Sequence, residues 1–390
     1  MQDLSNPPRF RPALVGRAAP RVAIIHYWLV GMRGGEKVIE ELCRMYPQAD
    51  IYTHVYDRDR ISDTINRHNV RTTRIAGFPM ARRMYQNYLP FMPRALEEID
   101  LTGYDLVISS ESGPAKGVIA PPDAFHLCYC HSPMRYLWDQ YHTYRNGAGR
   151  LTRAVMPHLA HRLRMWDVTS AARVDAFAAN STHVAARIRK YWRREAQVVA
   201  PPVELGAFRP APRGDIGNYY LWAGELAPYK RPDLMIDAFN QLGLPLVVIG
   251  GPDKAREKLQ RRAGGHIRFL GRAPDDVMRH HMARCRALIF PGEEDFGIVP
   301  VEVMASGRPV IAFGRGGACD SVVHGQTGWL FPDQTKEALT DAVHAFEASG
   351  LADADPQGLT RHAAQYGEDA FRAGIAAMLP PDLRPVVPAG

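Results

Sequence analysis

Two glutamates separated by seven residues flank a glycine at which a helix is expected to begin. Glu294 follows an apolar run at residues 287–291, which is typical of a buried parallel strand. Gly297 allows a sharp turn because it has no Cβ, and Glu302 lies within the helical segment that follows. The free amides and the positive dipole end of that helix suit a phosphate. These amides belong to Gly297, Ile298 and Val299.

The two carboxylates indicate a sugar at the same place. A carboxylate repels a phosphate, so Glu294 and Glu302 should not both face the bound anion. A carboxylate instead accepts hydrogen bonds from the hydroxyls of a sugar. The pattern therefore favours a sugar diphosphate, with its anion on the helix amides and its hydroxyls on the glutamates. An ordinary strand–loop–helix with solvated acids is the alternative, because this spacing also arises by chance.

Short apolar runs alternate with helical stretches, which predicts parallel sheets covered by helices on both faces. A proline-rich stretch at residues 198–214 is interpreted as a linker between two such regions. The expected fold class is therefore α/β, with two Rossmann-like domains. The predicted strands are 21–26, 50–55, 104–109, 125–131, 219–222, 246–249, 267–270, 287–290 and 310–312. The predicted divisions are a flexible segment 1–20, a first domain 21–200, a second domain 201–365, a C-terminal helix 366–382 and a tail 383–390.

The first predicted domain offers two further candidate positions. A glycine-rich turn follows the first strand, and its Gly34 and Gly35 would bring backbone close to a ligand. The turn is not G-x-G-x-x-G, which argues against an oxidoreductase with a nicotinamide cofactor. His131 lies at the carboxyl end of a predicted strand, where ligands bind in α/β sheets. A tight turn and a structural histidine are the plainer interpretations.

The motif from Glu294 to Glu302, with Phe296 and Gly297 after the first glutamate and a small-residue run to Gly307, resembles a known signature. It is similar to the E-x7-E motif of retaining GT-B glycosyltransferases of family 4 (GT4), or glycosyl transferases group 1. Within this family it resembles WbaZ-type bacterial mannosyltransferases, over about residues 21–379. The resemblance implies a GT-B fold, in which two Rossmann-like domains face each other across a cleft. It also implies retaining transfer of a hexosyl unit from a nucleotide-diphosphate sugar, with GDP-mannose as the expected donor and with no cofactor and no metal.

The resemblance also implies roles for single residues. Glu294 and His131 are the catalytic candidates, since the first would hold sugar hydroxyls and the second would approach the transferred sugar. Glu302 would bind the ribose of the nucleoside. Gly34 and Gly35 match a Gly-Gly that lies against donor and acceptor. The other donor-binding candidates are Arg272, Phe296, Gly297, Ile298 and Val299.

One position departs from the pattern of the family. Lys230 matches a lysine that grips the donor diphosphate. Its partner in the family is an arginine, and Glu225 stands at that position here. The reversed charge puts the usual pair of cations in doubt. Arg231 or Arg135 is expected to replace the missing arginine.

The charge distribution suggests a membrane surface as a partner. The net charge is +7, and the excess of basic residues lies in the first 200 residues. Residues 64–96 contain arginines and aromatic residues but no acid, and no nucleic-acid-binding motif accompanies them. Contact with anionic lipid is therefore preferred to nucleic acid, and a solvated basic face is the alternative. The residues expected at the membrane or acceptor are Arg71, Arg74, Arg82, Arg83 and Tyr85.

Composition favours a cytoplasmic enzyme, peripheral on the inner face of the plasma membrane. The first 20 residues do not form a secretory signal, and the five cysteines lack zinc-like spacing. The expected acceptor is a lipid-linked saccharide in bacterial surface or exopolysaccharide assembly. Two alternatives are open, a GT-B nucleotide-sugar epimerase and a non-catalytic sugar-nucleotide-binding protein. Incubation with donor and lipid extract would separate the three.

Overall fold

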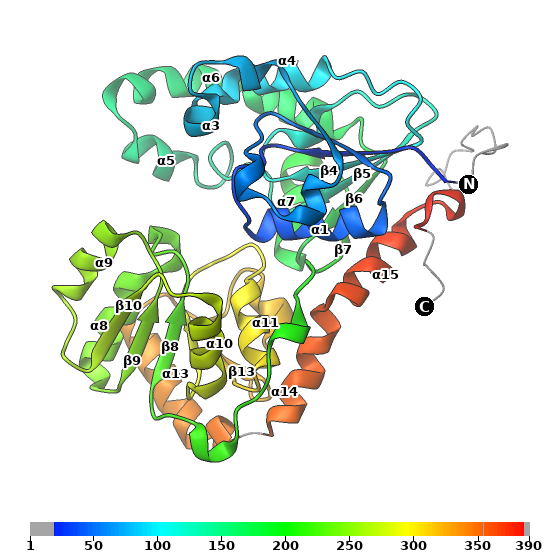
Figure 1. Cartoon of the computed structure of the whole chain (residues 1–390). Coiled ribbons are helices and arrows are strands. Elements are labelled where there is room, and N and C mark those ends of the chain that lie inside the picture. The colour runs from blue at the N-terminus through cyan, green and yellow to red at the C-terminus, as the bar shows by residue number, and fades with distance from the viewer. Residues whose placement is uncertain (1–18, 354, 386–390) are drawn as a thin grey trace, which may run out of the picture. The chain divides into compact units, whose positions relative to one another are not determined.

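Each half of the chain builds a parallel β-sheet of its own (Figure 1). The computed structural model of the chain describes residues 19–353 and 355–385. These residues fall into two units. The first unit holds residues up to Asn180, Val184–Val199 and residues from Arg372 on, and the second holds Ser181–His183 and Ala200–Phe371.

Within the described residues, the first sheet has seven strands in the order β3-β2-β1-β4-β5-β6-β7. Its central strands β1 (Val22–His26), β4 (Leu106–Glu111) and β5 (Phe125–Cys130) are buried along their whole length. Burial of this kind is expected where helices cover both faces of a parallel sheet. The remaining strands are β2 (Asp50–Thr53), β3 (Asn69–Thr72), β6 (Ala176–Ala179) and β7 (Gln197–Val198).

Helices of the first unit follow the strands in the manner of βαβ units. In α1 (Gly34–Met45), Val38, Ile39 and Leu42 are buried, and their spacing places them on one helical face. The longest helix is α6 (Arg150–Ala171), which contains Pro157. The others are α2 (Asp63–Asn66), α3 (Ala81–Met84), α4 (Met92–Glu97), α5 (Tyr141–Gly147) and α7 (Thr182–Trp192).

The second sheet has six strands in the order β10-β9-β8-β11-β12-β13 within the described residues. In β8 (Tyr220–Ala223), Tyr220 and Trp222 join one apolar cluster, whereas Leu221 and Ala223 join another. The alternation places a core on each face of the sheet. The other strands are β9 (Leu246–Ile249), β10 (Ile267–Gly271), β11 (Leu288–Phe290), β12 (Val310–Phe313) and β13 (Gly328–Phe331).

Helices cover both faces of the second sheet. The cluster with Tyr220 includes Phe239 of α8 (Pro232–Leu242) and Phe346 of α13 (Lys336–Ala348). The cluster with Leu221 includes side chains of α11 (Ile298–Ala305) and α14 (Pro356–Ala363). The other helices are α9 (Asp253–Gln260), α10 (Asp275–Arg284), α12 (Ala318–Ser321) and α15 (Glu368–Met378).

Both sheets contain a point at which the strand order reverses. In the first sheet it lies between β1 and β4, and in the second between β8 and β11. The connections that leave these two neighbouring strands run over opposite faces of the sheet. In open α/β sheets, ligands bind at the carboxyl ends of the strands at such a point. The fold itself therefore predicts where each unit should carry functional groups.

The predicted α/β class with two Rossmann-like domains is confirmed. The predicted strands appear, but β3, β7 and β13 were not predicted. Strand β3 has a mostly exposed, polar sequence, and β7 has only two residues. The predicted boundaries at 200 and 365 fall near the observed division, in which α15 changes unit at Arg372. The segment 1–20 lies almost wholly outside the described residues, as does most of the tail 383–390.

Candidate active site

In the second unit, an ion pair joins the two loops at the reversal of strand order. Lys230 ends a short turn (Pro228–Lys230) after β8, and Glu294 lies in the loop after β11. The Nζ atom of Lys230 donates to Oε1 of Glu294 at 2.6 Å. Both side chains keep some contact with solvent, at 14% and 17% exposure. The pair is therefore accessible to a ligand.

Glycines allow these loops to approach each other. A Cβ on Gly292 would lie 2.7 Å from the Cα of Lys230, which is closer than two carbon atoms can pack. Gly224, after β8, has a φ of +147° and lies beside the Lys230 side chain. Only glycine adopts such a backbone conformation readily. These two positions thus fix where the ammonium group lies.

A third loop, residues 314–317 after β12, supports the Glu294 loop. The amide of Gly317 donates to the carbonyl oxygen of Glu294 at 2.8 Å. A Cβ on Gly316 or Gly317 would overlap with the backbone of the Glu294 loop. The backbone at Glu294 is therefore held by contacts with the loop that follows β12.

Helix α11 begins directly after this loop. Gly297 has a φ of +86° and forms the N-cap, so the helix starts at Ile298. The first amides of a helix have no acceptor within the helix, which makes this end suitable for an anion. Phe296 is 4% exposed, and its ring packs 5.9 Å from that of Tyr366. Its side chain therefore belongs to the core and anchors the loop, while only its backbone lies at the candidate site.

Glu302 lies further along α11, where burial raises the pKa of its carboxyl to about 7 and Asp275 adds to the shift. Near neutral pH this group therefore holds a proton in part of the molecules. A carboxyl group in either state accepts hydrogen bonds from hydroxyls, and the protonated state also donates one. The chemistry suits a ribose, as the family resemblance implied.

Two other predicted cations already have carboxylate partners. Arg231 has a left-handed backbone conformation before α8, and its guanidinium lies 3.2 Å from Asp233. Arg272 lies 3.3 Å from Glu225, and both side chains are largely exposed. Surface pairs of this kind contribute little to stability, so a ligand can compete for either cation. Glu225 thus neutralises Arg272 and leaves Lys230 as the more enclosed cation.

In the first unit, the predicted glycines and histidine lie next to each other near the reversal of strand order between β1 and β4. Gly34 and Gly35 form the first turn of α1, and His131 follows the last residue of β5. A Cβ on Gly35 would lie 3.0 Å from the Tyr27 hydroxyl and 3.7 Å from Nε2 of His131. The helix start therefore lies beside the histidine ring, and the absence of a Cβ permits its close approach to the Tyr27 hydroxyl.

His131 is uncharged at neutral pH. Burial lowers its pKa to about 3, and the nearby His26 ring contributes in the same direction. Its Nε2 atom lies 2.8 Å from Oγ of Ser110, which in turn lies 3.1 Å from Nδ1 of His26. The sequence analysis missed Ser110 and His26, since serine and histidine at strand ends are too common to stand out.

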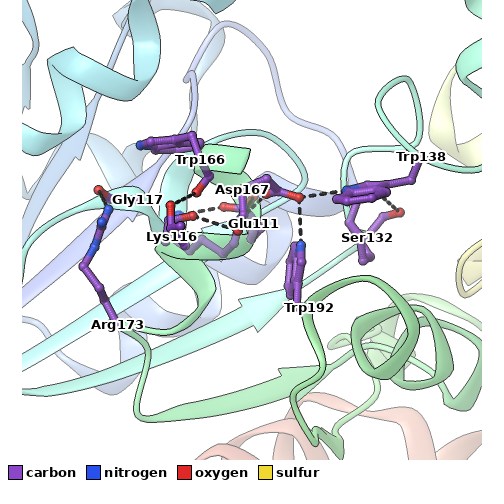
Figure 2. A network of polar contacts seen from close by, with 12 residues as sticks. Glu111, Lys116, Gly117, Ser132, Trp138, Trp166, Asp167, Arg173 and Trp192 are labelled. Carbon is purple, nitrogen blue, oxygen red and sulfur yellow. Dashed lines mark hydrogen bonds and ion pairs between the residues drawn. The ribbon is translucent and has the colours of Figure 1, made fainter. Parts of the chain in front are cut away.

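A second feature missed from the sequence is a buried charge network in the first unit. Lys116 lies between Glu111 and Asp167, and all three side chains are fully buried (Figure 2). The indole N–H groups of Trp138 and Trp192 donate to Oδ2 of Asp167 at 2.8 and 2.7 Å. Burial raises the pKa of Glu111 to about 7. Burial also disfavours the Lys116 charge, but Asp167 and Glu111 outweigh this and raise the lysine pKa.

The arginines expected at a membrane differ in whether a carboxylate offsets their charge. Arg71 lies 3.6 Å from Asp50 and Arg74 lies 3.2 Å from Glu98, so carboxylates outside residues 64–96 offset both charges. Arg82 and Arg83 are exposed on α3. Tyr85 packs against Trp28 with ring centroids 4.6 Å apart. No helix among the described residues is long and apolar enough to span a bilayer.

The family of the chain follows from two sequence matches. Residues 32–206 match the family described as Glycosyltransferase Family 4, and residues 209–366 match Glycosyl transferases group 1. This chain belongs to the family 4, group 1 glycosyltransferases. The two matched regions of this glycosyltransferase meet in the predicted linker. The second region contains the whole second sheet, and the first contains the first sheet except for β1.

Curated relatives of this glycosyltransferase carry the name D-inositol 3-phosphate glycosyltransferase. The one from Jonesia denitrificans is 32% identical over 206 residues, covering 44% of this chain and 48% of the relative. The one from Streptomyces bingchenggensis is 28% identical over 235 residues, covering 52% of each. The chain spans about half the length of the curated relatives it matches.

Solved structures share the GT-B fold of this glycosyltransferase over nearly its whole length. Anabaena HepE in complex with UDP and glucose has a TM-score of 0.65 at 16% identity, covering 92% of this chain and 98% of its own. Sucrose-phosphate synthase from Thermosynechococcus elongatus has a TM-score of 0.68 at 16% identity, with the same coverage. The lipopolysaccharide outer core galactosyltransferase WaaB has a TM-score of 0.64 at 15% identity, covering 92% and 100%.

Proposed function

We propose that this chain transfers a hexosyl unit, with retention of configuration, from a nucleotide-diphosphate sugar to a lipid-linked saccharide. The observation that supports this most directly is the Lys230–Glu294 pair at the strand reversal of the second sheet. It joins a cation suited to a diphosphate and a carboxylate suited to sugar hydroxyls. Glu294 lies in the loop that leads into α11, whose N-cap is Gly297.

The pair suggests how donor binding and bond breaking are linked. Without a ligand, the Lys230 ammonium binds the Glu294 carboxylate. A diphosphate at the start of α11 competes for the ammonium, and Glu294 becomes available to the hydroxyls of the sugar. When the glycosidic bond breaks, negative charge increases on the diphosphate, where Lys230 and the helix amides stabilise it. Because these contacts strengthen as the charge develops, they favour the transition state over the bound donor.

The remaining candidates complete the donor and acceptor contacts. Glu302 would bind the ribose through its carboxyl group. His131 is neutral, so it would contact the transferred sugar through a hydrogen bond and not through a charge. The Gly34–Gly35 turn would bring its own backbone close to the ligand. No group of three or more metal-binding side chains occurs in the described part of the chain. The proposal uses no cofactor.

The sugar and the base of the donor can be tested directly. The resemblance to WbaZ-type enzymes favours GDP-mannose. The complexes of HepE with UDP and with UDP-glucose make UDP-glucose the competing donor. Purified protein should be titrated with both nucleotide sugars, and released nucleoside diphosphate should be measured. Glu294→Gln is the test variant, and Glu337→Gln, on the exposed face of α13, is the matched control.

The acceptor is tested in the same reaction. Addition of a bacterial lipid extract should give a labelled glycolipid whose new linkage has the anomeric configuration of the donor by NMR. The names of the curated relatives make inositol 3-phosphate the alternative acceptor. A changed nucleotide sugar without transfer would identify an epimerase. Tight donor binding without any product would identify a binding protein, and either result would contradict the proposal.

A further inference from the structure

A chain of polar contacts leads from His131 into the interior of the first unit. Nε2 of His131 lies 2.8 Å from Oγ of Ser110, and the same oxygen lies 3.1 Å from Nδ1 of His26. His26 and Ser110 are directly paired in the register of β1 and β4, and both are fully buried. The contacts therefore lie at the reversal of strand order in the first sheet, beneath a candidate catalytic residue.

The inner end of this chain is a carboxylate. Nε2 of His26 lies 3.9 Å from Oε1 of Glu36, and it has no hydrogen-bond partner among the described residues. The other oxygen of Glu36 accepts from the Arg33 amide at 3.1 Å, which fixes the side chain at the start of α1. Glu36 is only 3% exposed. A buried carboxylate attracts an N–H group and repels a nitrogen lone pair, so when the His26 ring carries a single N–H, that N–H is favoured on Nε2.

This preference sets the direction of the remaining contacts. With its proton on Nε2, His26 has a lone pair on Nδ1 and accepts the hydroxyl hydrogen of Ser110. A hydroxyl has only one hydrogen, so Ser110 can then only accept from His131. His131 must therefore carry its own proton on Nε2. Its second ring nitrogen, Nδ1, keeps a lone pair.

We propose that Glu36, His26 and Ser110 are positioning residues that hold His131 in the Nε2–H tautomer, so that its Nδ1 accepts a hydrogen bond from a hydroxyl of the bound sugar. This inference rests on the proposed function, which places a sugar at His131. The low pKa of His131 agrees with it, because only a neutral ring has a tautomer to select.

The tautomer can be measured without a substrate. Two-bond nitrogen–proton NMR spectra of the full chain, labelled with 15N-histidine, distinguish a ring protonated on Nε2 from one protonated on Nδ1. We expect the wild type to show the Nε2–H form of His131 at neutral pH. Ser110→Ala and Glu36→Gln should each add the Nδ1–H form. An Nδ1–H ring in the wild type, or an unchanged tautomer in both variants, would overturn the proposal.

Strand β4 offers a matched control. Ser109 is the neighbour of Ser110, and its Oγ lies 2.9 Å from Nε2 of the buried His126. Ser109→Ala therefore removes the same kind of buried contact from the same strand without touching His131. We expect the His131 tautomer to be unchanged in this variant. A change as large as that in Ser110→Ala would mean that any disturbance of β4 alters the ring, which contradicts a directed chain of contacts.

Kinetics separate this inference from the proposed function. Loss of one hydrogen bond to a reacting group should lower kcat of Ser110→Ala roughly tenfold, with the KM for the donor nearly unchanged. Ser109→Ala should retain wild-type kcat. If the wild type transfers sugar and Ser110→Ala is equally fast, the positioning role is wrong while the proposed function stands. If the wild type transfers no sugar, the proposed function fails, and the tautomer measurement still tests the chain of contacts.

Discussion

Two lysine–carboxylate systems, one in each unit of this glycosyltransferase, differ in their access to water. Lys116 is fully buried between Glu111 and Asp167, and its ammonium also lies 4.2 Å from the centre of the Trp192 ring (Figure 2). Lys230 and Glu294 form a single pair with part of each side chain exposed. A fully enclosed charge cannot exchange its partner for a ligand, whereas an accessible one can. Similar chemistry thus serves packing in one unit and, in our proposal, binding in the other.

The largest effect is expected from removing the enclosed cation. Lys116→Met should lower the free energy of unfolding by about 3–5 kcal/mol, because Glu111 and Asp167 would stay buried without a cation. Urea unfolding followed by tryptophan fluorescence measures this, since two indoles bond to Asp167. Lys230→Ala is the matched comparison and should unfold at nearly the wild-type urea concentration. Equal destabilisation by both changes would remove the distinction between the two systems.

The next effect concerns catalysis at the accessible pair. Glu294→Gln should leave stability almost unchanged and lower kcat at least tenfold, since a hydrogen bond to a charged group contributes about 1.5–3 kcal/mol. Turnover of the proposed donor should be compared with that of Glu337→Gln. A correctly folded Glu294→Gln protein with the wild-type rate would refute the catalytic assignment.

The cations Lys230 and Arg231, in the loop after β8, can be ranked. Lys230→Ala should weaken donor binding more than Arg231→Ala, because Lys230 is more enclosed and Arg231 is already bound to Asp233. Calorimetric titration with the nucleotide sugar measures both. The reverse order would show that Arg231 takes the role of the family's arginine, at whose position Glu225 stands. It would also show that the Lys230–Glu294 pair is not the diphosphate site.

The dependence of stability on pH extends the comparison to Glu302. Its pKa is raised from 4.5 to about 7, so between these values the folded protein holds a proton that the unfolded chain releases. Stability therefore falls as pH rises through this window. Glu302→Gln keeps a neutral side chain and should lose less stability than the wild type between pH 5 and 7. Urea midpoints at both pH values test this, and parallel changes in the two proteins would contradict the burial of the carboxyl group.

The smallest effect is expected at the exposed arginines. Each arginine near anionic lipid contributes about 1 kcal/mol, so Arg82→Glu with Arg83→Glu should weaken sedimentation with anionic vesicles. Arg71→Glu with Arg74→Glu should weaken this sedimentation less, because carboxylates already offset these two charges. Binding should also decrease with salt. A wild type that ignores anionic vesicles at low salt would make these arginines a solvated face and would favour a soluble acceptor.

Sequence alone determined the fold class and the position of the loop that contains Glu294. Buried strands such as β1 and β4 are apolar throughout, and a parallel sheet requires the alternation with helices that the sequence displays. Gly297 and Glu294 could be identified because a helix start after a strand is a local pattern of residue types. The position of Lys230 in the family motif also follows from local sequence.

Only the tertiary structure decided which of these groups are partners. Lys230 and Glu294 lie far apart in the sequence and meet because β8 and β11 are neighbours where the strand order reverses. Residues 64–96 contain no acid, yet Asp50 and Glu98 reach two of their arginines from outside. His26, Ser110 and His131 come from three strands whose carboxyl ends converge. Pairings of this kind depend on strand order and burial, which residue types and spacing along the chain do not encode.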